Sequence, residues 1–173
     1  MSDLERKGAV TFKGNAITLM GPEIKVGDHA PDFKVIANDL SEVTLQSSKG
    51  KTRVISVVPS LDTPVCQVQT NRFNAEAANF SEGTQVYAIS VDLPFAQKRW
   101  CGASEANHIQ ALSDHRELSF GKAYGVLIKE LKLLARAVFI IGSDDKIQYV
   151  EYVKEVTQEP DYEAALNALK AVR

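Results

Sequence analysis

A short apolar run, Val54–Val58, is the feature that most constrains what this chain can fold into. Its residues, Val-Ile-Ser-Val-Val, have the length of a strand and almost no polar face, which is typical of a parallel sheet covered on both sides. Apolar residues near helical spacing follow over Pro64–Phe80, and a second β-rich run follows at Gln85–Val91. Strand, helix and strand in this order predict a βαβ unit with a right-handed crossover.

Other elements are predicted on both sides of this unit. Alternating residues around Lys13–Ala16 predict an N-terminal β-hairpin over about residues 9–20. Ala135–Ile141 and Ile147–Val153, joined by a turn at 142–145, predict an antiparallel hairpin, and Asp161–Val172 predicts a closing helix. Shorter elements are expected as strands at Phe33–Ile36, Val43–Leu45 and Ile109–Leu112, and as helices at Leu118–Tyr124 and Pro94–Cys101, the latter with Gly102 as its C-cap.

These elements together define a fold class. A βαβ half followed by a ββα half is the outline of a thioredoxin-like domain, so we predict an α/β fold with a central mixed sheet, flanking helices and an extra N-terminal hairpin. No repeat, low-complexity tract or linker divides the chain, and residues 1–173 are therefore expected to form a single domain.

Composition excludes several classes of function. Twenty Lys and Arg residues balance 22 Asp and Glu residues, so neither a nucleic acid nor an acidic membrane is expected as a partner. Two cysteines are too few for a disulfide scaffold or a four-thiolate zinc site, and His29, His108 and His115 are scattered, so we expect no metal and no cofactor. No apolar stretch is long enough for a signal peptide or a membrane span. We therefore expect a cytoplasmic location, where a cysteine pair is more often catalytic or redox-sensing than structural.

The first cysteine lies at the predicted start of a helix. Thr63 is a favoured N-cap residue, Pro64 suits the first helical position, and Cys66 then occupies the third. Unpaired N–H groups of the first turn and the helix dipole stabilise a thiolate there, so Cys66 is a candidate nucleophile. The Thr63 hydroxyl is placed to donate to the sulfur or to a substrate oxygen. The alternative is that Cys66 is a small buried apolar residue.

Arg136 lies within the apolar run Leu133–Ile141, where a strand should be buried. An unpaired guanidinium in a protein core is very costly, so it must reach water or an anion. Arg136 therefore either extends from an edge strand to solvent or faces the Cys66 thiolate and binds the oxygens of a small substrate.

Pro59, Thr63, Cys66 and the downstream Arg136 together resemble the active-site signature of the peroxiredoxins. Longer segments resemble the bacterial thiol peroxidase subfamily, which is of the atypical two-cysteine type, and the similarity covers nearly the whole chain. These segments are Val57–Cys66, Asp92–Cys101, Ser113–Arg116 and Leu133–Ala137.

The resemblance implies a thiol-dependent peroxidase that reduces hydrogen peroxide and organic hydroperoxides in antioxidant defence. Cys66 would be the peroxidatic cysteine that becomes a sulfenic acid, and Cys101 the resolving cysteine that forms an intramolecular disulfide with it. Thioredoxin would reduce this disulfide, and the assembly would be a homodimer. Pro59 would shape the pocket around the sulfur, although ending a strand is an equally physical role for it.

Several points qualify this interpretation. No cysteine follows Arg136, so the C-terminal resolving cysteine of the typical two-cysteine class is missing. Closing a Cys66–Cys101 disulfide requires a short Cα separation, which predicts local unwinding around one or both cysteines. Cys101 is expected at a helix C-terminus, where the dipole disfavours a thiolate, and its alternative role is packing beside Trp100. The rival functions are a redox sensor, a Cys–His hydrolase using His115, and a non-catalytic scaffold.

Overall fold

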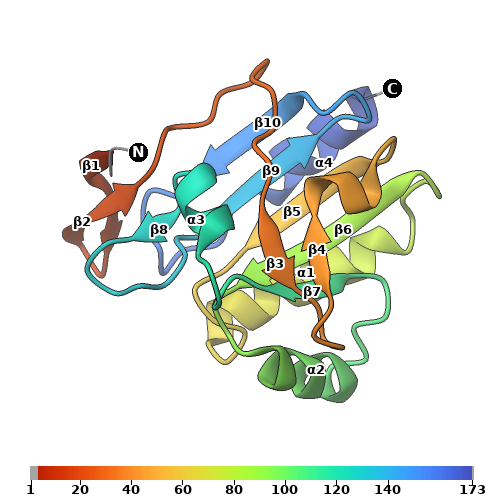
Figure 1. Cartoon of the computed structure of the whole chain (residues 1–173), viewed down its shortest axis with the longest axis horizontal. Helices are drawn as coiled ribbons and strands as arrows, with labels where there is room; N and C mark the ends of the chain where they lie inside the picture. The colour runs from red at the N-terminus through yellow and green to blue at the C-terminus, as the bar shows by residue number, and fades with distance from the viewer. Residues whose placement is uncertain (1–3, 173) are drawn as a thin grey trace.

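The computed structural model describes residues 4–172 and contains a seven-stranded mixed sheet with the strand order β10-β9-β5-β6-β7-β3-β4 (Figure 1). Three central strands run parallel, and every other pairing in this sheet is antiparallel. The parallel strands are β5 (Thr52–Val57), β6 (Thr84–Ser90) and β7 (Gln110–Ser113), and the others are β9 (Ala137–Ile141), β10 (Ile147–Tyr152), β3 (Lys34–Ile36) and β4 (Glu42–Thr44). The predicted central mixed sheet is confirmed.

Side chains of the central strands alternate between two apolar layers. Val54 and Val86 pack on one face with Phe73 and Ala165, which come from α1 (Pro64–Ala77) and α4 (Tyr162–Ala171). The neighbouring residues of the same strands, such as Ile55, point to the opposite face and join the larger core. Figure 1 shows α1 and α4 behind the sheet and α3 (Ser119–Ala123) in front of it. The sheet is therefore covered on both sides, as the apolar run Val54–Val58 predicts.

The N-terminal hairpin is formed by β1 (Glu5–Phe12) and β2 (Asn15–Met20), so it begins earlier than the predicted residue 9. Its turn places Lys13 and Gly14 at positive φ angles of 51° and 81°, which suits the right-handed twist of the strands. The hairpin is joined by β8 (Leu127–Ile128), a strand that sequence patterning does not predict because two residues carry no periodicity.

Several predicted boundaries differ from the structure. The helix α2 (Pro94–Ala103) continues through Gly102, and its cap is Ser104, whose N–H donates to the Trp100 carbonyl oxygen at 2.9 Å. Gly102 as a C-cap is therefore wrong, because this glycine keeps a helical conformation instead of the left-handed one that a C-cap glycine supplies. The helix predicted over Pro64–Phe80 ends at Ala77, and the strand predicted over Val43–Leu45 ends at Thr44, where a 3-10 turn (Leu45–Ser48) begins.

Candidate active site

Cys66 lies in the first turn of α1, directly after the buried strand β5. Thr63 is the N-cap in an extended conformation, with φ −112° and ψ 149°, and Pro64 follows at the first helical position. The first helical hydrogen bond runs from the Gln67 N–H to the Thr63 carbonyl oxygen at 3.0 Å. The Cys66 side chain is fully buried. The first-turn N–H groups and the positive end of the helix dipole therefore act on this thiol with little screening by water.

Arg136 contacts the Cys66 sulfur. Its Nη2 donates to Cys66 Sγ at 3.4 Å, its Nη1 to Gln69 Oε1 at 3.0 Å and its Nε to the Val156 carbonyl oxygen at 2.8 Å. Arg136 immediately precedes β9 and is only 2% exposed, so it does not extend to solvent from an edge strand. None of the ion pairs formed among residues 4–172 involves Arg136. The buried guanidinium is thus placed to stabilise negative charge on the sulfur.

Gln69 is a site residue that sequence reasoning missed. It lies three positions after Cys66, hence on the same helix face, and it is fully buried. Its amide nitrogen donates to Ser56 Oγ at 2.8 Å and to the Val57 carbonyl oxygen at 3.3 Å, while its oxygen accepts the hydrogen bond from Arg136. The available signal was a polar residue in the apolar stripe of the predicted helix. Gln69 holds the guanidinium toward the sulfur.

Thr63 and Pro59 border this helix start. The Thr63 hydroxyl donates to the Ser60 carbonyl oxygen at 3.1 Å, so in this structure its proton points there and not at the Cys66 sulfur. The hydroxyl oxygen keeps its lone pairs for a substrate O–H. Pro59 is buried and follows Val58, whose N–H makes a sheet-type hydrogen bond to the Ile89 carbonyl oxygen at 3.1 Å. Because proline lacks an N–H, the ladder ends at this point.

Cys101 lies in the last turn of α2 and is partly exposed. It packs against the same apolar cluster that contains Cys66 and Trp100, together with Val58, Leu61 and Ala106. Both cysteines are free thiols in the structure. Burial raises the pKa of the Cys101 thiol, so this cysteine stays protonated near neutral pH. The two cysteines therefore have different environments. The Cys66 sulfur lies beside the cationic Arg136, whereas Cys101 packs against apolar residues.

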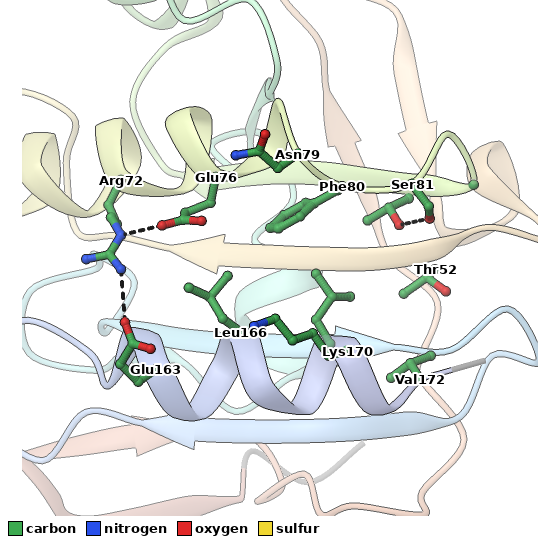
Figure 2. Close-up of a pocket in the computed structure, with 13 residues that line it drawn as sticks. Thr52, Arg72, Glu76, Asn79, Phe80, Ser81, Glu163, Leu166, Lys170 and Val172 are labelled. Carbon is green, nitrogen blue, oxygen red and sulfur yellow. Dashed lines mark hydrogen bonds and ion pairs between the residues drawn. The ribbon is translucent and has the colours of Figure 1, made fainter.

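Two cavities lie near these elements. Cys101 borders one of about 320 Å³, which is also lined by residues 37–39, 41, 106 and 109–111. A larger groove of about 670 Å³ runs between α1 and α4, where Figure 2 shows Arg72 bonded to Glu76 and Glu163 at one end and Phe80 and Leu166 along the groove. The larger groove contains none of the predicted site residues. The candidate active site is therefore located from the contacts of Cys66 and not from the size of a cavity.

Residues 4–172 contain no arrangement typical of a metal site. In this range no group of three or more His, Cys, Asp or Glu side chains is arranged to hold a metal ion. Arg136 is the residue that donates a hydrogen bond to the Cys66 sulfur. Among residues 4–172, the imidazole of His115 makes no hydrogen bond, and its backbone N–H donates to Ser113 Oγ at 3.3 Å. A Cys–His dyad is therefore not formed. Within the same residues, no helix has both the length and the apolar character needed to cross a membrane.

The sheet order, the flanking helices and a cysteine at the start of α1 define a thioredoxin-like α/β protein with a buried thiol site. Residues 25–166 match the family model described as Redoxin, and the chain belongs to this family.

Within the Redoxin family, the chain is similar in sequence to proteins named thiol peroxidase. It is 63% identical to the thiol peroxidase of Halalkalibacterium halodurans, over 94% of this chain and 98% of that protein. It is 55% identical to the thiol peroxidase of Bacillus subtilis, over 94% and 97% of the two chains. The crystal structure of a peroxiredoxin-like protein from Aquifex aeolicus superimposes with a TM-score of 0.89 at 44% identity, covering 98% and 99% of the two chains. The predicted resemblance to bacterial thiol peroxidases and the predicted fold are confirmed.

Proposed function

We propose that the Cys66 thiolate is the nucleophile of this peroxiredoxin-type peroxidase. The observation that carries the proposal is the 3.4 Å contact between Arg136 Nη2 and Cys66 Sγ, made by a buried cation that has no carboxylate partner among the described residues. Membership of the Redoxin family and identity of 55–63% to thiol peroxidases support the same activity.

The first step is attack of the Cys66 thiolate on the terminal oxygen of a hydroperoxide. A sulfur–oxygen bond forms, the oxygen–oxygen bond breaks, and Cys66 becomes a sulfenic acid while an alcohol or water leaves after taking a proton. Arg136 and the first-turn N–H groups stabilise the charge that develops on the oxygens. The Thr63 oxygen, whose own proton is donated to Ser60, accepts the hydrogen bond of the hydroperoxide O–H. Pro59, which is buried beside this turn, is assigned the role of shaping the space around the sulfur.

The second step joins the two cysteines. The Cys101 sulfur condenses with the Cys66 sulfenic acid, a disulfide forms, and water leaves with the Cys101 proton. Because Cys66 is fully buried in a helical turn and Cys101 lies in the last turn of another helix, the step requires local unwinding. An external dithiol then reduces the disulfide by exchange, and thioredoxin is the proposed reductant.

The cellular setting follows from the same proposal. The substrates are hydrogen peroxide and organic hydroperoxides, and the role is antioxidant defence in the cytoplasm. We further propose that residues 1–173 act as a single domain and that the chain assembles as a homodimer.

The test is peroxide consumption in a thioredoxin-coupled assay. Cys66→Ser removes the nucleophile, so we expect turnover to fall to the level of the reaction without enzyme, and full turnover by this variant would refute the assignment. Cys101→Ser is expected to oxidise once and then to stop. Mass spectrometry of the oxidised wild-type protein should show a Cys66–Cys101 crosslink. Oxidation without thioredoxin-dependent turnover would instead indicate a redox sensor.

A further inference from the structure

A polar network lies at the carboxyl ends of the three parallel strands, outside the contacts described above. These ends meet at one edge of the sheet because β5, β6 and β7 run in the same direction. Asp92 follows β6 and lies at the centre of the network. It comes directly before Leu93, the N-cap of α2, which is the helix that carries Cys101.

Asp92 joins the three strand ends through four hydrogen bonds. Its Oδ1 accepts from Ser60 Oγ at 2.7 Å, and its Oδ2 accepts from the Leu61 N–H at 2.8 Å and from Ser90 Oγ at 2.6 Å. Its backbone carbonyl oxygen accepts from Ser113 Oγ at 2.5 Å. Hydrogen bonds to a carboxylate are stronger than those between neutral groups, so the Asp92 side chain holds Ser60, Leu61 and Ser90 in place.

The turn that Asp92 holds is the one that leads into α1. The Ser60 carbonyl oxygen accepts from the Thr63 N–H at 3.3 Å and from the Thr63 hydroxyl at 3.1 Å. Through Ser60 and Leu61 the Asp92 carboxylate therefore fixes the position of Thr63 and of the first turn that contains Cys66. The same residue fixes the start of the Cys101 helix.

We propose that Asp92 is a positioning residue whose hydrogen bonds to Ser60 and Leu61 hold the turn before Cys66 to the start of the Cys101 helix. We call this link the latch. This inference rests on the proposed function, because it assigns Asp92 an effect on each of its two steps. With the latch closed, Thr63 and Cys66 are held in place for the hydroperoxide. With the latch open, the first turn of α1 is free to unwind toward Cys101. Loss of the carboxylate therefore slows the first step and speeds the second.

Asp92→Asn is the variant that tests this. The amide has nearly the same shape, but one of its two polar atoms is a donor, so it cannot accept all the hydrogen bonds from Ser60, Leu61 and Ser90. Trp100 is the only tryptophan of the sequence and packs in the same cluster as Cys66, so its fluorescence follows both steps in rapid mixing. We expect the second-order rate of Cys66 oxidation to fall about tenfold, and disulfide formation to become about threefold faster.

Asp114→Asn is the matched control. Asp114 is a buried aspartate, whereas Asp92 is partly buried. The Asp114 carboxylate accepts two backbone N–H bonds, from Phe120 at 3.1 Å and from Gly121 at 2.7 Å, and neither donor belongs to the Cys66 turn. At pH 7 we expect this variant to change each rate by less than about twofold.

A second readout is the loss of Cys66 to sulfinic acid at high peroxide. Faster disulfide formation shortens the life of the sulfenic acid, so Asp92→Asn should accumulate less sulfinic acid per turnover than the wild type. Equal rates for Asp92→Asn and wild type, a slowing of both steps, or the same changes in Asp114→Asn would overturn the latch. If Cys66→Ser retains full turnover, the proposed function fails instead, whatever Asp92→Asn does.

Discussion

At the scale of single residues, the site depends on hydrogen bonds that hold Arg136 against the Cys66 sulfur. The guanidinium has three different acceptors, namely the sulfur, the Gln69 oxygen and the Val156 carbonyl oxygen. The planar guanidinium carries N–H donors that point in three directions, one to each acceptor. A lysine ammonium is a single point of charge on a flexible chain, so it cannot reach all three acceptors at once. Positive charge alone is therefore not sufficient at position 136.

We expect Arg136→Lys to lower the second-order rate of peroxide reduction by about 100-fold, since the charge remains but the directed donors are lost. Gln69→Ala should lower the same rate by about tenfold, because Arg136 loses one of its orienting bonds. Stopped-flow fluorescence with hydrogen peroxide measures both. Gln67→Ala, an exposed neighbour in the same turn, is the control and should behave as wild type. An unchanged rate for Arg136→Lys would contradict the assigned role.

At the scale of elements, the N-terminal hairpin is tied to the rest of the fold at two separate places. Glu155 accepts hydrogen bonds from Thr11 Oγ1 at 2.9 Å and from the Gly14 N–H at 2.8 Å, which fixes one end of the hairpin to the segment after β10. At its other end, the chain after β2 passes close to the loop between α3 and β8. Gly125 lies in that loop at a φ of 67°. A Cβ on Gly125 would overlap the Pro22 carbonyl oxygen.

Gly125→Ala is therefore expected to destabilise the protein by about 3 kcal/mol, because the new methyl group meets backbone and the residue is held at positive φ. Chemical denaturation followed by Trp100 fluorescence measures the change. Gly83→Ala serves as the comparison, since a Cβ there meets no atom within 4 Å, and we expect a change below about 1 kcal/mol. Equal stability of the two variants would show that the hairpin contact does not constrain the fold.

At the scale of the whole molecule, stability depends on pH through a buried acid. Burial raises the pKa of Asp114 to about 6, and the N–H groups of Gly121 and Phe120 offset only part of this effect. Because the pKa is raised in the folded state, the contribution of Asp114 to stability is complete below the unfolded pKa near 4 and is lost as the pH rises through about 6.

Asp114→Asn removes this titration. The wild-type free energy of unfolding minus that of the variant should therefore fall by up to about 3 kcal/mol between pH 4 and pH 7. Urea denaturation at several pH values provides both curves, and the difference between them cancels groups that titrate alike in the two proteins. A difference that stays constant or rises with pH would show that the pKa of Asp114 is not raised in the folded state.

The sequence by itself determined the features that depend on short stretches of chain. Apolar patterning indicated the βαβ unit and both hairpins, and the Thr63-Pro64 pair located Cys66 in a first helical turn, because capping acts within a single turn. The tertiary structure alone decided between the two possible environments of Arg136, found Gln69 and added β8. Arg136 and Cys66 lie 70 positions apart, and which buried polar groups meet at that separation depends on how α1, β5 and β9 pack, which local patterns do not specify.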